Sequence, residues 1–424
     1  VTWFARYLIV ALLAKLMLES GIVKFTSFGI NNENTWRDLT ALDFHYWTQP
    51  LPHGLSPWID SLPAWLDQFS LLSMYGIELI LPFLLFFPGN FRRIAVLGQI
   101  ILQVAIILSG NYGFFNLLTL CICIPLIDDQ ILPKYFLKYG KMEVNENKVS
   151  ELGRKTAYES LPYTIIQTSF LTVAWFFFSV TTYGHIARDI HGNQTDPILE
   201  IDANWTDKYI NIIRPTRAFN SYGLFRVMTT TRPEIIIEGS LDGKTWHPFS
   251  FKYKPTDPNL SPRYAGFHMP RIDWQMWFEG LNYERYTEHP FSRMLYHKFL
   301  STIALRGNIE DFIDFKNILG QKEYQAFIHS PPMIQQRVLQ NYNSLLNAFQ
   351  SRSLWFGNLL EAIFEHRAEV MNQLEESFEG LPTKPNFIRV SLAHYQFSQS
   401  DPKASDQSVW HIQPIEGSSF VIER

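Results

Sequence analysis

The uneven distribution of apolar residues constrains this fold more than any other feature of the chain. Hydrophobic residues make up 46% of the sequence and charged residues 18%, but the apolar side chains are crowded into the first 185 positions. A helix needs about 20 mainly apolar residues to cross about 30 Å of hydrocarbon. Five segments approach this requirement: Trp3–Val23, Phe69–Phe87, Ile94–Ser109, Tyr112–Ile127 and Tyr163–Tyr183. We therefore predict a transmembrane helical domain of about five spans over residues 1–184. The third and fourth segments are short, so a tight helical hairpin turning at Gly110 and Asn111 is the alternative.

Basic residues predict the sidedness of these spans, because Lys and Arg near span ends favour the cytoplasmic face. They fill the second-to-third and fourth-to-fifth connections: Arg92, Arg93, Lys134, Lys138, Lys141, Lys148, Arg154 and Lys155. Alternation then places the loop from Lys24 to Gln68, the Asn111 turn and everything after about His185 on the opposite face. The glycosylation sequons at Asn193, Asn204 and Asn259 all fall in that exported half.

Ionisable residues inside spans are expensive and usually have partners. Lys15 and Glu19 are four residues apart on one helix face and are expected to pair. Glu78 has no obvious partner in its own span. We predict that these residues tie helices together, with a polar site within the membrane as the alternative.

The second half of the chain changes to short β-rich runs with turn signals. We expect strands at Ile210–Ile213, Gly223–Thr229, Glu234–Glu238 and Phe249–Tyr253, with a hairpin turn at Ser240–Gly243 because Asp-Gly accepts positive φ. A last strand is expected at Phe387–Phe397, where apolar and polar residues alternate. The tail from Ser398 to Arg424 is polar and is expected to be loosely ordered.

Helical spacing interrupts this β pattern at Met294–Leu300 and Leu354–Phe364. The predicted fold class is therefore an α+β membrane protein, with a helical transmembrane bundle followed by an exported antiparallel β-sandwich that carries a helical insertion. The expected domains are the transmembrane part at 1–184, the sandwich at 185–282 and 386–424, and the insertion with connecting helices at 283–385.

Charge and cysteine content exclude several classes of function. The net charge of −4 and the pI near 6.3 provide no broad basic field for nucleic acid. The only cysteines, Cys121 and Cys123, are two apart in an apolar run, which excludes a disulfide framework, a CxxC redox site and a cysteine zinc site. The histidines at 185, 191, 247 and 268 show no convincing ligand spacing. We predict no metal and no cofactor.

Several long strings stand in a fixed order along the chain: SGIVK at 20–24, TWRDLTALDFHY at 35–46, TQPLP at 48–52, SGNYGFFNLLT at 109–119, NSYGLF at 220–225, TRPE at 231–234, EGS at 238–240 and RIDWQMWF at 271–278. Together these strings resemble the lipase maturation factor family. The resemblance covers most of the chain. It implies further membrane helices before Val1, and it makes residues 283–351 look like an insertion, because Trp355 onward resumes the family pattern.

The resemblance implies an integral membrane protein of the endoplasmic reticulum in animals that certain secreted dimeric lipases need to reach their active fold, with relatives in bacteria. In a bacterium the expected location is the inner membrane. The expected partners are a client protein such as a secreted lipase and the lipid bilayer, without nucleic acid. The membrane part is distantly similar to that of vitamin K-dependent carboxylase, which is an analogy of fold and transfers no reaction.

Predicted topology puts the Trp36–Pro52 loop, the Asn111 turn and the soluble domain on one face, so this shared face is the candidate functional surface. Arg37 is expected to pair with Asp38 or Asp43, and His45 is either structural or a proton carrier. Asn111 and Asn116 are expected to bond helix ends or a ligand. The 273–278 aromatics are either an exposed patch or core. The candidate residues are Trp36, Arg37, Asp38, Asp43, His45, Gln49, Asn111, Tyr112, Asn116, Asp273, Trp274 and Trp277.

Three classes of function remain open at this stage. A maturation factor that holds a client is favoured by the family strings. A membrane enzyme resembling the carboxylase would need an isolated acid–base group facing a pocket. A lipid- or glycan-binding protein would need exposed aromatic and polar side chains on the sandwich loops. The sequence identifies no catalytic residue and favours a function without catalysis.

Overall fold

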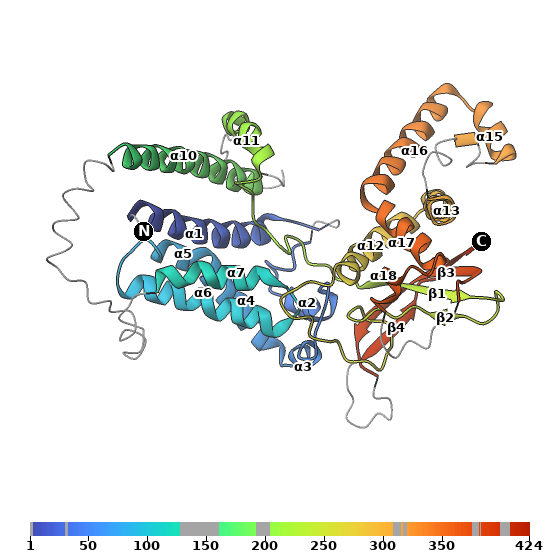
Figure 1. The fold of residues 1–424 in the computed structure, drawn as a ribbon, viewed down its shortest axis with the longest axis horizontal. Coiled ribbons are helices and arrows are strands. Elements are labelled where there is room, and N and C mark those ends of the chain that lie inside the picture. The colour runs from blue at the N-terminus through green and yellow to red at the C-terminus, as the bar shows by residue number, and fades with distance from the viewer. Residues whose placement is uncertain are drawn as a thin grey trace. The chain divides into compact units, whose positions relative to one another are not determined.

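The computed structural model of the chain describes residues 3–29, 33–127, 161–191, 204–307, 315–316, 320–374, 381, 383–398 and 408–424. The chain forms two compact units (Figure 1). The first, here the helical unit, comprises Val1–His45, Leu62–Leu108 and Phe114–Met228. The second, here the mixed unit, comprises Tyr46–Ser61, Ser109–Gly113 and Thr229–Arg424. The predicted α+β class is confirmed, because helices and an antiparallel sheet both occur.

The described part of the helical unit contains helices and connecting turns. Its α-helices are α1 (Trp3–Thr26), α4 (Ala64–Tyr75), α5 (Leu81–Leu84), α6 (Asn90–Ser109), α7 (Phe114–Cys123), α10 (Leu161–His191) and α11 (Asp207–Ile213). Its short helical turns are the π-helix η1 (Gly76–Ile80) and the 3-10 helices η2 (Ile124–Leu126), η3 (Asn204–Thr206) and η4 (Arg214–Thr216). Helix α2 (Leu42–Thr48) runs across the boundary between the two units. Within the described part of the chain, two helical stretches, Asn90–Ser109 and Ile165–Ile190, are long and apolar enough to cross a membrane.

The first, second and fourth predicted spans differ in length or continuity from these two helical stretches. The first is the 24-residue helix α1. The second is divided between α4, η1 and α5, and the fourth is the shorter apolar helix Phe114–Leu126. The basic residues from Lys134 to Lys155 and the sequon at Asn193 lie outside the described residues.

Helix α6 has an inverted distribution of polar and apolar side chains. Gln99 and Gln103 are buried in the helical unit, whereas Ile94, Leu97 and Ile101 are exposed. The Gln99 amide donates to the Ile77 carbonyl at 2.9 Å, and Gln103 accepts from Asn116 at 2.8 Å. A water-soluble helix buries its apolar face instead. This distribution suits hydrocarbon surroundings, in which polar groups must be satisfied by other protein groups.

Buried ion pairs join helices in the same unit. Lys15 pairs with Glu19 as predicted, and its Nζ lies 3.5 Å from Nδ1 of His185 on α10. Lys24 Nζ lies 2.7 and 2.8 Å from the two carboxylate oxygens of Glu78. Each of these carboxylates is therefore compensated by a cation.

The described strands of the mixed unit form one antiparallel sheet of five strands. The strands are β1 (Pro233–Ser240), β2 (His247–Pro248), β3 (Phe387–Phe397), β4 (Trp410–Pro414) and β5 (Phe420–Glu423). Their order is β2-β1-β3-β4, and β5 pairs with the first part of β3. In the register of β1 and β3, Pro233 lies opposite His394 and Ser240 opposite Phe387.

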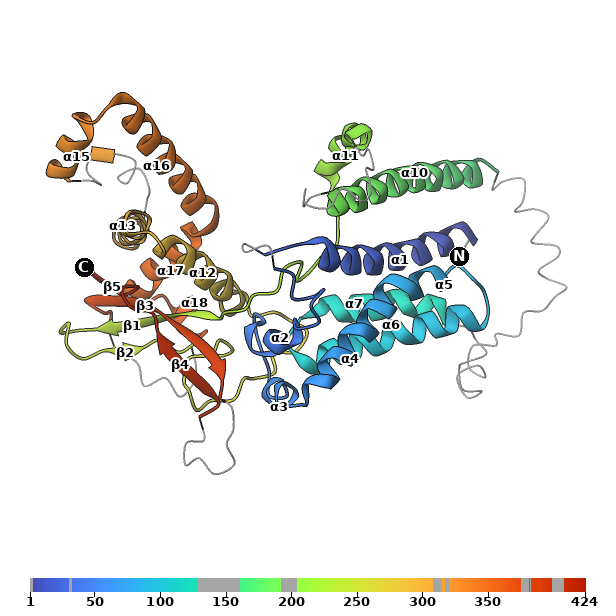
Figure 2. The same ribbon diagram turned by 180° about the vertical axis from the view of Figure 1, so that it is seen from behind.

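Helices follow the first hairpin and return the chain to the sheet (Figure 2). They are α12 (Arg271–Thr287), α13 (Pro290–Arg306), α15 (Gln321–Ile328), α16 (Pro332–Arg352), α17 (Leu354–Phe364) and α18 (Ala368–Met371), with α3 (Ser56–Asp60) contributed by the earlier segment. Gly280 allows α12 to approach β1, because a Cβ there would lie 2.2 Å from the Pro233 carbonyl oxygen.

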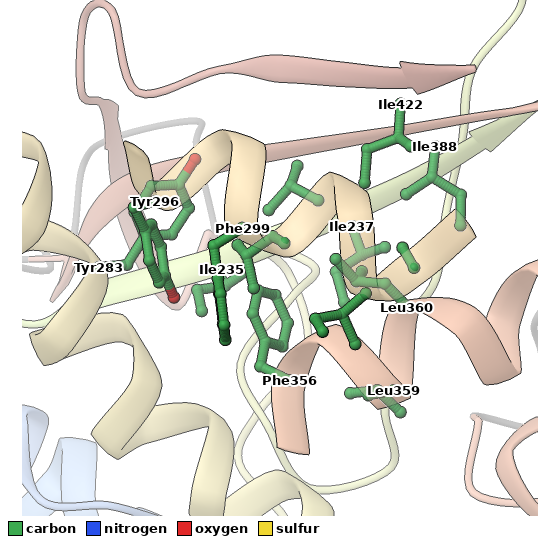
Figure 3. Close-up of a cluster of buried hydrophobic side chains, with 14 of the residues drawn as sticks. Ile235, Ile237, Tyr283, Tyr296, Phe299, Phe356, Leu359, Leu360, Ile388 and Ile422 are labelled. Carbon is green, nitrogen blue, oxygen red and sulfur yellow. The ribbon is translucent and has the colours of Figure 1, made fainter. Parts of the chain in front are cut away.

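Strands and helices of the mixed unit share a buried hydrophobic core. Ile237 of β1 and Ile388 of β3 belong to the same buried cluster as Phe299 of α13 and Leu360 of α17 (Figure 3). The alternating Ile388, Val390 and Leu392 supply the apolar side of β3. Helices therefore cover the sheet here. A second facing sheet, as in a sandwich, does not occur among the described residues.

Several sequence predictions are confirmed and others are wrong. Strand β3 has the predicted bounds, and Gly243 has a φ of +70° in the predicted turn. Residues 210–213 are helical instead of extended, because a four-residue segment with three isoleucines does not by itself distinguish helix from strand. Residues 223–229 form no strand, and Phe251 makes only an isolated bridge with Leu374.

The prediction of a loosely ordered tail is wrong for its described part. Strand β4 pairs with the end of β3, and β5 pairs with the beginning of β3. Trp410 and Ile422 are buried, so each short strand contributes one apolar anchor to the domain. The polar composition of the tail gave no indication of these two strands, because a strand needs only its inward-facing side chains to be apolar.

Candidate functional site

The mixed unit brings together three segments that are distant in the sequence. Residues 46–61 and 109–113 belong to the same compact unit as residues 229–424. Buried polar side chains connect them, and we call this set the junction. Its members are Gln49, Tyr112, Asn111, Arg232, Glu234, Lys254, Asp273 and Trp277.

Arg232 is the central cation of the junction and is fully buried. Its guanidinium donates to the carbonyl oxygens of Trp47 at 2.9 Å, Pro50 at 3.0 Å, and Gln49. Burial lowers the pKa of Arg232, and the adjacent Glu234 carboxylate opposes that shift. The planar guanidinium suits this role, because its several N–H donors can bond three carbonyl oxygens of the 47–50 turn at once.

Glu234 carries the negative charge that compensates Arg232. One carboxylate oxygen lies 2.7 Å from Arg232 Nη2, and the other lies 2.8 Å from Lys254 Nζ. All three side chains are almost completely buried. Removal of one member of such a set leaves an uncompensated charge in a low-dielectric environment, which costs much more than the intact pairing contributes.

Gln49 and Tyr112 link the first segment to the turn between α6 and α7. The Gln49 amide donates to the carbonyl oxygens of Tyr46 at 2.9 Å and Ser109 at 2.8 Å. The Tyr112 hydroxyl donates to the Gln49 side-chain oxygen at 2.6 Å. Burial raises the pKa of Tyr112, so the hydroxyl remains a neutral donor.

Asn111 uses both ends of its amide to hold two loops. Its nitrogen donates to the carbonyl oxygens of Pro52 at 3.0 Å and Arg263 at 2.8 Å. Its oxygen accepts from the Ala265 backbone N–H at 2.8 Å. These contacts satisfy backbone groups that would otherwise be buried without partners, which is the structural role expected of an asparagine at a turn.

Helix α12 contributes Asp273 and Trp277 to the junction. The Asp273 carboxylate accepts from the backbone N–H groups of Tyr253 and Lys254, both at 2.9 Å. Burial raises the pKa of Asp273, and these two hydrogen bonds oppose the shift. The Trp277 indole donates to the Thr48 carbonyl oxygen at 2.7 Å. Trp277 is buried, Trp274 is half-buried and Phe278 is exposed.

The remaining candidate residues belong to the helical unit. Trp36 is buried and donates to the Phe225 carbonyl oxygen at 3.0 Å. The Arg37 guanidinium lies over the Phe25 ring at 4.4 Å, and Asp38 and Asp43 are exposed. Burial, together with the nearby Lys24 ammonium, lowers the pKa of His45 to about 4, well below the range of a proton carrier at neutral pH. Asn116 is buried against Gln103.

Sequence reasoning did not identify the charged centre of the junction. Arg232 and Glu234 appeared only as part of a family string, and Lys254 was not singled out. The sequence does contain a signal for this centre. Arg232 and Glu234 lie just before Ile235, Ile236 and Ile237, and charged residues beside such an apolar run are placed where burial is expected. Their pairing is decided by tertiary contacts.

The junction's polar atoms are directed at other protein groups. Most of its hydrogen bonds end on backbone carbonyls and N–H groups of the mixed unit, and Tyr112 donates to the Gln49 side chain, so its chemical role is to hold the 46–61 segment and the 109–113 turn in place. Among the residues that the structure describes, no group of three His, Cys, Asp or Glu side chains is arranged to hold a metal ion.

Helices suited to a membrane, followed by an α+β domain that holds part of an inter-helix loop, define a class of membrane-associated α+β proteins. Comparison with known families places the chain within this class. The lipase maturation factor transmembrane domain matches residues 1–134, and the lipase maturation factor C-terminal domain matches residues 218–304. The chain belongs to the lipase maturation factor family, as predicted.

Relatives of both named kinds are similar to the chain. Lipase maturation factor 2 of Xenopus laevis is 30% identical over 370 residues, which cover 67% of this chain and 50% of the relative. Lipase maturation factor 2 of Homo sapiens is 30% identical and covers 66% of this chain and 49% of the relative. Lipase maturation factor 1 of Mus musculus is 29% identical and covers 71% and 50%. The chain thus spans about half the length of these relatives. No solved structure matches it.

Proposed function

We propose that this chain acts as a membrane-bound maturation factor that assists the folding or assembly of secreted lipases or other exported clients. The observation that carries the proposal is the presence of both lipase maturation factor domains in one chain, in the order membrane domain then C-terminal domain. Relatives named for lipase maturation extend over two thirds of the sequence.

The proposed location is a multi-pass helical bundle in the endoplasmic reticulum membrane of a eukaryote, or in the inner membrane of a bacterium. The inverted side-chain distribution of α6 supports this location. So does α10, where Ile166 and Phe170 are exposed on a helix long enough to span. An apolar surface of this kind is costly in water and favourable in hydrocarbon.

The proposed working surface is on the mixed unit, on the exported side. The junction is its scaffold, because its buried polar groups are engaged with backbone. A client would contact exposed side chains around it. This arrangement favours client binding over a carboxylase-like enzyme, since the candidate residues of the mixed unit contribute to holding the fold. A lipid- or glycan-binding protein is the other alternative, and exposed aromatic side chains such as Trp58 and Tyr264 are the feature it would use.

Secretion of an active lipase tests the proposal. The full natural protein would be expressed in cells that lack their own maturation factors, together with a secreted dimeric lipase and an unrelated secreted phosphatase. We expect the activity per mass of secreted lipase to rise while phosphatase activity is unchanged, and the lipase precursor to co-purify with the protein. Abundant, membrane-inserted protein with no effect on lipase activity and no lipase bound would contradict the proposal.

A further inference from the structure

Five exposed apolar side chains of the mixed unit lie on two segments that are connected to the 109–113 turn. We call Leu55, Trp58, Leu260, Tyr264 and Phe267 the interfacial patch. Trp58 is 62% exposed, Tyr264 56% and Phe267 48%. The unit also has a buried hydrophobic core, so these aromatic side chains are exposed on a domain that packs other aromatic side chains inside.

The two loops of the patch are held together by direct contacts. The rings of His53 and Tyr264 lie 6.0 Å apart in an edge-to-face arrangement. A Cβ placed on Gly54 would lie 3.6 Å from the Pro262 carbonyl oxygen. The segment 53–58, which includes the start of α3, and the loop 260–267 are therefore neighbours in space.

Asn111 fixes both loops to the turn that connects α6 and α7. It donates to Pro52 and Arg263 and accepts from Ala265, so Tyr264 is held between two hydrogen-bonded positions. On the same side, a Cβ at Gly113 would meet Met269 at 2.8 Å and the Phe267 carbonyl oxygen at 3.6 Å. The patch therefore cannot move far from residues 109–113.

The length of α6 gives the expected depth of the 109–113 turn in a bilayer. Its 20 residues correspond to about 30 Å of helix, which matches the hydrocarbon thickness. Asn111 follows the last residue of α6 by two positions, at most about 7 Å of chain. The headgroup layer on each side is about 5–8 Å thick. Residues bonded directly to Asn111 are thus expected at the level of the headgroups.

We propose that the interfacial patch rests in the headgroup region of the bilayer and fixes the mixed unit on the membrane surface. Trp and Tyr suit this position, because each has an apolar ring and a polar group that stays hydrated. Leu55, Leu260 and Phe267 supply the apolar contact area. This inference rests on the proposed membrane insertion of α6.

Depth measurements with nitroxide labels test the proposal on the full chain. The two native thiols would be removed as Cys121→Ser and Cys123→Ala, and single cysteines introduced as Tyr264→Cys, Phe267→Cys or Leu260→Cys. Matched controls are Met333→Cys on α16 and Val421→Cys on β5, which replace residues of the same unit that are 82% and 51% exposed. Ile101→Cys on α6 reports insertion. Each labelled protein is reconstituted in phosphatidylcholine vesicles and must elute at the size of the unlabelled chain.

Accessibility to oxygen relative to a water-soluble nickel chelate distinguishes the outcomes. We expect the ratio at 264 and 267 to be several-fold higher than at 333 and 421, and that at 101 to be higher still. Equal ratios at 264, 267 and the controls, with a high ratio at 101, would overturn the patch and leave membrane insertion intact. A low ratio at 101 would contradict insertion itself. Shielding of 264 and 267 from both reagents would indicate a protein partner and would also overturn the proposal. Leu260→Cys decides the question if one patch variant misfolds.

Discussion

Lys24 and Glu78 form a buried ion pair between α1 and η1, with Nζ 2.7 and 2.8 Å from the two carboxylate oxygens. Glu78 therefore has a partner 54 positions away in the sequence. Glu78 lies in η1, a π-helix, whose i→i+5 hydrogen bonds widen the turn and change the angular spacing of its side chains relative to an α-helix.

Breaking this pair should destabilise the protein. We expect Glu78→Gln or Lys24→Met to cost about 3–5 kcal/mol, since each leaves a buried charge without its partner. Thermal unfolding of the full chain in detergent would measure the loss. The double variant Lys24→Met with Glu78→Leu should recover much of the stability, and Lys208→Met, at an exposed position, is the control. Additive losses in the double variant would show that the two residues do not act as a pair.

Arg232 gives a second prediction about buried charge. We expect Arg232→Met to lower stability by about 3–5 kcal/mol, because the carbonyls of the 47–50 turn lose their donor and Glu234 retains only Lys254. Limited proteolysis should then cut within residues 46–61 earlier than in the parent chain. Arg271→Met removes an exposed arginine from the start of α12 and should behave like the parent. Unchanged proteolysis in Arg232→Met would mean that the segment is held by other contacts.

Glu279 predicts a dependence of stability on pH. Its carboxyl is fully buried beside the Tyr296 hydroxyl, which donates to it, and burial raises its pKa from 4.5 to about 7. Because the folded state holds the proton more tightly, its stabilising contribution is fully present below about pH 4.5 and is lost as pH rises through 7. The loss is of the order of 3 kcal/mol.

The variant Glu279→Gln should remove most of that pH dependence, since the amide is neutral throughout. Unfolding midpoints of the full chain between pH 5 and pH 8 would show the parent falling relative to Glu279→Gln. Glu369→Gln, at an exposed position on α18, is the matched control and should follow the parent. Parallel curves for the parent and Glu279→Gln would show that Glu279 is not the group responsible.

The helices between residues 283 and 351 should prove essential to the mixed unit. The sequence suggested an added module whose removal leaves the sheet intact. Leu295, Phe299 and Leu300, however, are buried in the cluster that includes Ile235 and Ile388. We therefore expect deletion of 283–351 in the full chain to cause aggregation, measured by size-exclusion chromatography in detergent. Phe299→Ala alone should cost about 3–5 kcal/mol, whereas Met333→Ser should be neutral. A monodisperse, cooperatively unfolding deletion product would restore the added-module interpretation.

Sidedness is the fifth prediction. A reporter fused after Lys141 should be cytoplasmic, because basic residues fill that connection, and one fused after Asn259 should be exported. Protease protection in sealed vesicles measures both. The opposite sidedness for either reporter would contradict the shared face on which the proposed working surface depends.

Local patterns were sufficient to predict several elements. The alternation of Phe387–Phe397 specified a strand with correct bounds, and Asp242-Gly243 specified a turn, because period and backbone freedom are properties of neighbouring residues. The Lys15–Glu19 pair follows in the same way from four-residue spacing on a helix. The long family strings also identified the family, since they depend on residue order alone.

Tertiary structure decided the features that depend on distant partners. Residues 210–213 became helix, and the tail gained β4 and β5, because short runs take the state that their packing surroundings favour. The partnerships of Glu78 with Lys24, and of Arg232 with Glu234 and Lys254, required the chain to bring separate segments together. Sequence determines which charges are too costly to bury alone, whereas only the folded chain determines which opposite charge lies within reach, because that distance depends on the packing of every element between them.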